Sequence, residues 1–508
     1  MQRNTMADQL YIGIDSGTQG TKGVVLSGQS GEFVAESYHG YELIENERGG
    51  REQHPESWIE ACTNVLTDLL SVPSIKSADV KAIGVSGQQH GMVPLDDRGR
   101  VIRPAKLWCD TETVRQCEII TARAGGEQAV LEAIGNQVAA GFTASKVLWL
   151  RDHEPESYER LATVLLPHEY INFWLTGERA AEYGDASGTA YFDVVNRCWS
   201  ETLIQAIDPS GKLQECLPGF VAADEPVGHL RAELCERFNL SPELLVSAGG
   251  GDNMMAAIGT GNVNPGVVTA SLGTSGTIYA YADRPVVDDR GELASFCSSS
   301  GGWLPLVCTM NVTVATELVR SLLGLDLDEM NQLAEAASPG SEGVLLVPYF
   351  NGERTPPLPG ATAHLGGLTS LNMKRQNFCR AAIEGATFGL RYGLEVLRRN
   401  NIEPRQIRMT GGGAKSPLWR QLVADSFNCE VVCVQQEEAG AAGAALQALW
   451  CAEKAAGNQT TIEEITSRFV ALDERTRCEP DQNSVAVYAE LYREYLKYDQ
   501  VLRPVNSV

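Results

Sequence analysis

Apolar and polar positions form two kinds of segment along this chain. Short apolar runs that end in turns of Gly, Ser and Thr are typical of buried strands, and they occur at residues 10–15, 22–27, 80–86, 267–272 and 407–410. Longer stretches with helical periodicity predict helices at residues 55–71, 143–151, 158–176 with an interruption at Pro167, 377–399 and 436–454. In the first of these helices, the apolar side chains that share one side are Trp58, Cys62, Val65, Leu66 and Leu69.

A strand followed by a glycine-rich turn and a second strand occurs near the start of each half of the chain. The first set reads LYIGID, SGTQGT and KGVVLS, and the second set begins with VVTASL and the turn GTSG. This repetition predicts two domains of related build that face each other across a cleft. Gly, Asn and Pro at residues 261–266 predict a hinge. We therefore place the domains at residues 8–262 and 263–508.

Length and charge limit the classes of function. With 508 residues, and roughly 150 residues per domain, the chain has room for two large domains or three smaller ones. Its 41 Lys and Arg against 65 Asp and Glu give a net charge of −24. This charge argues against nucleic acid or an acidic membrane surface as a partner. A phosphate ligand stays open, because a local Lys or a Mg2+ ion can supply positive charge.

Cysteine usage and hydropathy indicate the compartment. The 13 cysteines are scattered and form no CxxC pair. An odd, dispersed set is typical of reduced thiols in the cytoplasm rather than of a disulfide framework. The chain has no apolar stretch approaching the ~18 residues of a membrane span, and its start does not resemble a secretory leader. We expect a cytoplasmic protein that does not bind membranes.

The segment at residues 247–276 combines an acid with a turn suited to phosphate. Asp252 follows three glycines, and the later turn contains Gly273, Thr274 and Ser275. Glycines let the backbone approach a ligand closely, and such a turn offers N–H groups and hydroxyls to a phosphate. A base beside a phosphate cradle is what a kinase of small alcohols needs. The alternative is a glycine-rich loop with an ordinary capping Asp.

The turn of the first hairpin has a similar composition. In the functional interpretation, the N–H groups around Gly17 and Thr18 face an anion, Lys22 balances its charge, and Asp15 holds a hydrated metal ion. A plain hairpin turn is the alternative. The turn matches neither a P-loop nor a dinucleotide-binding fingerprint, since GxxxxGK[ST] and GxGxxG are both missing here.

Other polar turns suit a hydroxylated ligand or a nucleotide. Gln89 and His90 lie between glycines after the strand at residues 80–86, which suits a sugar, although a lone His is more often structural. Trp108 could stack on a sugar, although a Trp more often belongs to the core. In the last third, a glycine run leads into a helix with Ser416 as its N-cap, which fits a nucleotide platform.

Taken together, the motifs resemble those of the FGGY carbohydrate kinases of the actin, hexokinase and heat-shock ATPase superfamily. They appear in the family's order over nearly the whole chain: YIGIDSGTQGTK, GQQHGM, LWCD, GFTASKVLWL, LPHEYINFWLTGE, GDASGT, GGGDN, SLGTSG, PYFNGERTPP and MTGGGAKSPLWRQLVAD. The resemblance implies an α/β fold of two actin-like (ribonuclease H-like) ATPase domains that face a central cleft. It also implies ATP and Mg2+ as cofactors, a sugar as substrate, and a homodimer.

The resemblance assigns roles residue by residue. Asp252 matches the catalytic base, and Asp15 matches the acid that organises Mg2+, in our expectation through water. The residues implied to bind the sugar are Gln89, His90, Trp108, Asp185, Asp252 and Asn253. The residues implied to bind ATP are Gly17, Thr18, Lys22, Gly273, Thr274, Ser275, Gly352, Gly412, Gly413, Ala414 and Ser416. Because an Asp has an ordinary pKa near ~3.9, we expect positioning of Asp252 to matter more than its basicity.

Within the family, the chain most resembles members that phosphorylate D-xylulose at its 5-hydroxyl to give D-xylulose 5-phosphate. Gln89 departs from this pattern, since some bacterial members carry Met there. The alternatives are a kinase of ribulose, gluconate, fuculose or an alditol, and a non-catalytic sugar- or nucleotide-binding regulator. GQQHG differs from the arginine–acid pair of glycerol kinases, and an actin-like filament protein would have no need of GQQHG or GGGDN.

Overall fold

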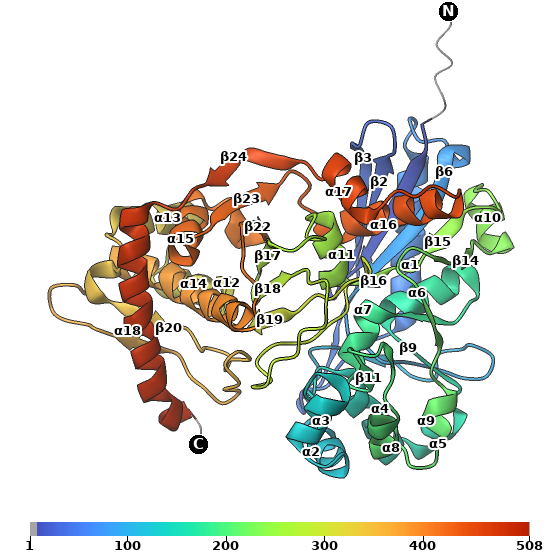
Figure 1. Cartoon of the computed structure of the whole chain (residues 1–508), viewed down its shortest axis with the longest axis horizontal. Helices are drawn as coiled ribbons and strands as arrows, with labels where there is room; N and C mark the ends of the chain where they lie inside the picture. The colour runs from blue at the N-terminus through green and yellow to red at the C-terminus, as the bar shows by residue number, and fades with distance from the viewer. Residues whose placement is uncertain (1–7, 507–508) are drawn as a thin grey trace, which may run out of the picture.

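The computed structural model describes residues 8–506 and consists of two lobes, each built on one large mixed sheet (Figure 1). The first sheet has the order β14-β15-β6-β1-β2-β3, with β16 also paired to β6. The second has the order β19-β18-β17-β22-β23-β24. Helices pack on both sheets, so the expected α/β class with two actin-like halves is confirmed.

The N-terminal sheet is built around the predicted hairpin. Strands β1 (Leu10–Ser16) and β2 (Gly20–Ser27) pair antiparallel and place Asp15 opposite Lys22. β2 pairs antiparallel with β3, β1 pairs parallel with β6, and β6 pairs parallel with β15 and β16. The bounds of the other strands are Phe33–Gly40 for β3, Val80–Gly87 for β6, Pro226–His229 for β14, Leu245–Ser247 for β15 and Gly250–Gly251 for β16.

The C-terminal sheet repeats this arrangement. β17 (Val267–Leu272), β18 (Gly276–Ala280) and β19 (Leu306–Thr309) form an antiparallel meander. On the other side, β17 pairs parallel with β22, and β22 pairs parallel with β23. The bounds of the remaining strands are Gln406–Thr410 for β22, Glu430–Val434 for β23 and Leu472–Cys478 for β24. Both halves therefore place a meander and parallel strands around one central strand, as the repeated strand–turn–strand pattern predicted.

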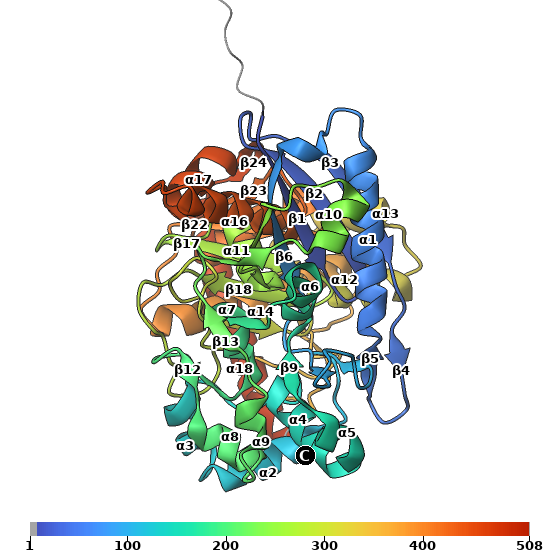
Figure 2. The same cartoon turned by 90° about the vertical axis from the view of Figure 1, so that its right-hand side faces the viewer.

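Helices cover the sheets where the sequence periodicity predicted them. α1 (Pro55–Ser71) packs on β2 and β3 and buries the five apolar side chains that share its side. α14 (Arg375–Arg399) packs on β18 and β19, and α15 (Pro417–Phe427) begins at Ser416, whose hydroxyl accepts a hydrogen bond from the Trp419 N–H. Figure 2 shows a group of shorter helices at one end of the N-terminal lobe: α2 (Val114–Arg123), α3 (Glu127–Ile134), α4 (Thr143–His153), α5 (Pro155–Arg160), α8 (Glu201–Ile207) and α9 (Lys212–Glu215).

The predicted helix at residues 158–176 is wrong in its middle, since residues 158–160 end α5 and residues 167–176 are helical but the stretch between them is not. Residues Thr163–Leu165 form strand β9, which pairs antiparallel with β7 (Val93–Leu95). Short range periodicity does not reveal this partner, and the tertiary pairing outweighs helix propensity. Pro167 begins helix α6 (Pro167–Thr176) at its first position instead of interrupting a longer helix.

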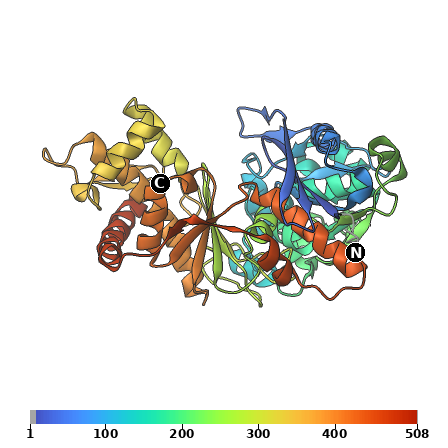
Figure 3. The same cartoon turned by 90° about the horizontal axis from the view of Figure 1, so that it is seen from above.

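α16 (Ala439–Ala455) comes late in the sequence but lies on the N-terminal sheet. It packs against β1, β6 and α11 (Asp252–Gly259), and Figure 3 shows it alongside the first strands of the chain. Glycines make this contact possible, because a Cβ on Gly13 would overlap the Ala441 carbonyl and a Cβ on Gly443 would overlap the Met255 carbonyl. The division of the chain after residue 262 stays a prediction.

None of the helices within residues 8–506 combines the length and the apolar character that spanning a bilayer requires. All thirteen cysteines carry free thiols.

We predict that Gly13→Ala lowers the free energy of unfolding by about 3 kcal/mol, because the added methyl overpacks a contact made of backbone. Urea titration followed by circular dichroism would measure the change. Gly219→Ala is the control, since a Cβ there meets no atom within 4 Å. Equal, small effects of both changes would contradict the importance of the α16 contact.

Candidate active site

Three neighbouring strands of the N-terminal sheet end at one edge and bring the predicted polar residues together. β1 ends beside Asp15, β6 runs into Gln89 and His90, and β16 leads into Asp252. Because β1, β6 and β16 are parallel, their carboxyl ends meet. A Cβ on Gly251 would lie 2.6 Å from the Gln89 side chain, so glycine is needed where these strands converge.

Asp252 is the first residue of α11, directly after the N-cap Gly251. Burial, then the charges of Asp15 and Asp185, raise the pKa of Asp252 to about 7, against opposing hydrogen bonds from Asn253. The expectation of an ordinary pKa for this carboxyl is therefore wrong. The sequence did not reveal the shift, because it arises from neighbours on other elements. A carboxyl that titrates near pH 7 can act as a general base at neutral pH.

Asn253 connects the base to both lobes. Its amide donates to Gln89 Oε1 at 2.9 Å and to Asp252 Oδ1 at 3.0 Å. Its own carbonyl oxygen accepts a hydrogen bond of 3.2 Å from the hydroxyl of Thr277 on β18. The side chain of Asn253 is therefore held from three directions, and it fixes one oxygen of Asp252.

His90 has a left-handed backbone conformation, and its ring packs against an aromatic neighbour. Its φ is 65°, and its ring packs on Phe142 with centroids 4.6 Å apart. Burial and then the charges of Lys146 and Arg354 hold the pKa of His90 well below its usual value, so the imidazole is neutral. Its Nδ1 is buried and has no hydrogen-bond partner among residues 8–506. This nitrogen lies against Gly188, where an added Cβ would be 2.0 Å from Nδ1, so contact of the ring with a sugar stays a prediction.

Lys146 supports this loop, and the sequence analysis did not single it out. The fully buried ammonium on α4 donates to the carbonyls of His90 at 3.0 Å, Gly141 at 2.5 Å and Phe142 at 3.1 Å. Burial lowers the pKa of Lys146 to about 7. The available signal was a Lys within the apolar stretch TASKVLWL, where a buried cation needs partners.

Trp108 and Asp185 occupy different environments. Trp108 is 37% exposed, and its indole N–H donates to the Thr18 hydroxyl at 2.9 Å, so it lies against the turn of the first hairpin. Asp185 is buried and forms an ion pair with His168, with Oδ2 and Nδ1 2.6 Å apart. Its Oδ1 has no hydrogen-bond partner in the described chain. Contact of either residue with a sugar stays a prediction.

The residues predicted to hold metal and phosphate meet at the start of α16. Asp15 Oδ1 accepts a hydrogen bond of 2.6 Å from the Ser86 hydroxyl, and burial raises its pKa. Lys22 Nζ lies 2.5 Å from Oε2 of Glu438, which directly precedes α16. A Cβ on Gly440 would lie 2.8 Å from the Asp15 carboxyl, so this helix start touches Asp15.

These groups fit a magnesium ion bound together with a nucleotide. Residues 8–506 hold no cluster of three or more His, Cys, Asp or Glu that could bind a metal by themselves. Mg2+ in phosphate sites uses one or two carboxylates and completes its shell with water and phosphate oxygens. Asp15 is such a carboxylate, and its neighbour Glu438 is a second one.

The predicted nucleotide residues come from loops at the end of the C-terminal sheet. The carbonyls of Gly273 and Thr274 accept hydrogen bonds from the N–H groups of Thr313 and Val312, at 3.0 and 3.1 Å, which fixes the turn between β17 and β18. The others lie in a short helical turn after β22, at the N-cap of α15 and in the loop at residues 350–358: Gly412, Gly413, Ala414, Ser416 and Gly352. A Cβ on Gly412 would meet no atom within 4 Å, so this turn is open to a ligand.

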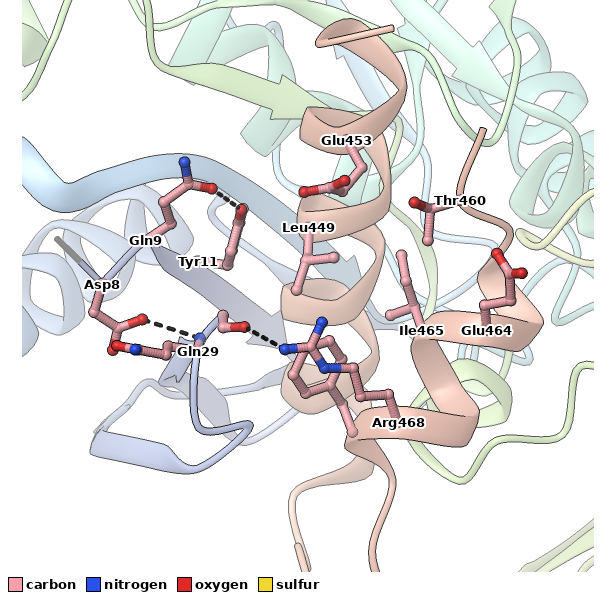
Figure 4. Close-up of a pocket in the computed structure, with 12 residues that line it drawn as sticks. Asp8, Gln9, Tyr11, Gln29, Leu449, Glu453, Thr460, Glu464, Ile465 and Arg468 are labelled. Carbon is pink, nitrogen blue, oxygen red and sulfur yellow. Dashed lines mark hydrogen bonds between the residues drawn. The ribbon is translucent and has the colours of Figure 1, made fainter. Parts of the chain in front are cut away.

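The cavity in Figure 4 is separate from this site. Its volume is about 530 Å³, and it is lined by residues that include Tyr11 of β1, Leu449 of α16 and Arg468 of α17 (Ile462–Phe469). Tyr11 and Asp15 lie near opposite ends of β1. The cavity therefore lies near the strand end remote from Asp15.

Comparison with known proteins agrees with this architecture. The model of the FGGY family of carbohydrate kinases, N-terminal domain, matches residues 10–259, and that of the C-terminal domain matches residues 268–452. A xylulose kinase from Haemophilus influenzae is 45% identical over 493 residues, covering 96% of this chain and 99% of its own. A xylulose kinase from Lactococcus lactis is 34% identical over 490 residues, covering 95% of both chains.

Solved structures are similar over the same length. The crystal structure of a xyloylose kinase from Brucella ovis has a TM-score of 0.89 and 30% identity, covering 98% of this chain and 100% of its own. A gluconate kinase from Lactobacillus acidophilus has a TM-score of 0.88 and 26% identity, covering 98% and 99%. With both family models matched in order and relatives similar over nearly the whole length, the chain belongs to the FGGY family of carbohydrate kinases.

Proposed function

We propose that this protein is an ATP-dependent xylulose kinase, which converts D-xylulose to D-xylulose 5-phosphate. The observation that carries the proposal is the 45% identity to a xylulose kinase over nearly the whole chain. The site geometry supports it, since a carboxyl with a pKa of about 7 lies beside polar groups suited to a sugar. The similar fold of a gluconate kinase makes gluconate the second candidate substrate.

In this proposal, Asp252 is the general base. It accepts the proton of the sugar 5-hydroxyl while that oxygen forms a bond to the γ-phosphorus of ATP. The bond from phosphorus to the β–γ bridging oxygen breaks, and ADP leaves. Asn253 holds one oxygen of Asp252, so the carboxylate keeps a fixed orientation toward the hydroxyl. The raised pKa makes Asp252 a stronger base than a solvated carboxylate.

The sugar would bind between α4 and the carboxyl ends of β6 and β16. Gln89, His90 and Asn253 offer hydrogen bonds to its hydroxyls, Trp108 offers an aromatic wall, and Asp185 lines the same region. His90 serves as a neutral partner, because burial lowers its pKa. Gln89, His90 and Asp185 are buried, which limits access of water that would otherwise compete as phosphoryl acceptor.

Phosphoryl transfer depends mainly on positioning and charge neutralisation. Asp15 would hold Mg2+ through water, and the ion would neutralise charge on the phosphates. The Lys22 ammonium would separate from Glu438 and contact the transferred phosphate. The backbone around Gly17 and Thr18 and the turn at residues 273–275 would supply N–H groups and hydroxyls.

The adenosine would lie on the glycine-rich platform that includes Gly412.

We also propose domains at residues 8–262 and 263–508, a cytoplasmic location and a homodimer. Thirteen free thiols support the cytoplasm.

We expect D-xylulose to stimulate ADP release from Mg-ATP more than D-ribulose, L-ribulose, gluconate or glycerol do. A coupled ADP assay at fixed ATP with each compound in turn measures this. Stimulation by gluconate alone would favour the second candidate. ATP binding without stimulation by any compound would point to a regulator.

We expect kcat/KM for the sugar to rise as the pH rises through about 7 and to level off above it, because the base acts only when deprotonated. Asp252→Asn should lower kcat by about 1,000-fold and remove this dependence. Asp97→Asn, at an exposed turn, is the charge-matched control. A rising limb at the same pH in residual activity of Asp252→Asn would argue against this assignment.

Replacing Lys146 by Met should raise the sugar KM about 10-fold and leave the ATP KM within about 2-fold, because the carbonyl of His90 and those of Gly141 and Phe142 lose their donor. Lys146→Gln keeps an amide donor and should recover part of the loss. Steady-state kinetics at 25 °C, with the melting temperature measured alongside, test this. Equal changes in both KM values would indicate general unfolding instead of a local role.

A further inference from the structure

Arg354 lies in a loop of the C-terminal lobe that is fixed by its neighbour Glu353. The buried Glu353 carboxylate accepts hydrogen bonds from the Arg354 N–H at 2.8 Å, the Met310 N–H at 2.7 Å and the Asn311 amide at 3.2 Å. The backbone of Arg354 is thus held in place. Its side chain is exposed, and no carboxylate forms an ion pair with it in residues 8–506.

The guanidinium of Arg354 reaches the sugar side of the cleft. Its Cζ lies 5.9 Å from the centre of the Phe142 ring, which packs on His90. Its charge lowers the pKa of both His90 and Cys308, although burial keeps the Cys308 pKa raised overall. A cation on the C-terminal lobe therefore lies close to residues of the N-terminal lobe that form the proposed sugar site.

The same guanidinium also lies near the strands that support the base. Cys308 on β19 pairs with Thr277 on β18, and the Thr277 hydroxyl donates to Asn253, the neighbour of Asp252. The Cys308 thiol feels the charges of both Arg354 and Asp252. Arg354 thus lies at the junction of the lobes, beside the paired strands whose Thr277 contacts Asn253.

The charges around the cleft suggest a role for Arg354. Asp15, Asp185, Asp252 and Glu438 make the cleft acidic, while ATP and a sugar phosphate are anionic. The other candidate cations are engaged, because Lys22 pairs with Glu438 and Lys146 is buried under carbonyls. The planar guanidinium suits bidentate contact with phosphate oxygens.

We propose that Arg354 is a further catalytic residue, which contacts the phosphoryl group as it passes from ATP to the sugar and then holds the phosphate of the product. Arg354 neither gains nor loses a proton in this step. It stabilises negative charge on the phosphoryl oxygens while Asp252 takes the hydroxyl proton. This role rests on the proposed kinase function and adds a residue to it.

Arg354→Ala should lower kcat about 100-fold or more, with the KM values for sugar and ATP within about 3-fold, since a donor to a charged transition state is lost. Arg354→Lys keeps the charge without the fork and should recover part of the rate. Guanidine added to Arg354→Ala should restore activity partly. The inhibition constant of D-xylulose 5-phosphate should rise about 10-fold in Arg354→Ala. Arg100→Ala removes an exposed cation from a turn in the other lobe and serves as the control.

The outcomes separate this inference from the proposed function. A kcat of Arg354→Ala within about 3-fold of the unchanged protein, or a loss confined to the sugar KM, would overturn the role of Arg354 and leave the kinase intact. Unchanged product inhibition would also count against it. If the unchanged protein showed no sugar-dependent ADP release, the proposed function would fail and the role of Arg354 would fail with it.

Discussion

The contact between α16 and the N-terminal sheet is the constraint on which the site depends. Glycine and alanine on α16, β1 and α11 let backbones meet with almost no side chain between them. The start of α16 touches Asp15 and places Glu438 beside Lys22, while its next turn supports α11, whose first residue is Asp252. One close-packed helix therefore positions both carboxylates. Close packing of this kind transmits small shifts, because the backbone atoms have no space to yield.

The free-energy cost of burying charge falls on Asp15 and Asp252, the two carboxylates of the proposed active site. Burial raises the pKa of both Asp15 and Asp252, and the charge of Asp15 raises the pKa of Asp252 further. The charge of Lys22 offsets part of this cost at Asp15. A nucleotide with Mg2+ would change this balance, because the metal favours the carboxylate of Asp15. Binding of the nucleotide and the basicity of Asp252 are therefore expected to be linked.

Local patterns predicted a large part of the fold. The first hairpin, α1, the strands at residues 80–86 and 267–272, and the N-cap at Ser416 all follow from periodicity and turn chemistry. The short strand at residues 163–165 was missed, since its partner β7 lies about seventy residues earlier and no local signal identifies it. Lys146 and Arg354 were missed as well, although both lie inside motifs that carried the family resemblance. Their importance depends on neighbours such as His90 that are distant in the sequence and close only in the folded protein.

The sequence by itself determined the elements, the order of the motifs and the residue types of the site, because each depends on neighbours within a few positions along the chain. It also determined the family through those motifs. Only the tertiary structure decided that α16 lies on the first sheet, that Asp252 has a pKa of about 7, and that Asn253 is bonded from both lobes. These properties come from burial and from charges and hydrogen bonds between residues far apart in sequence, which no local pattern contains.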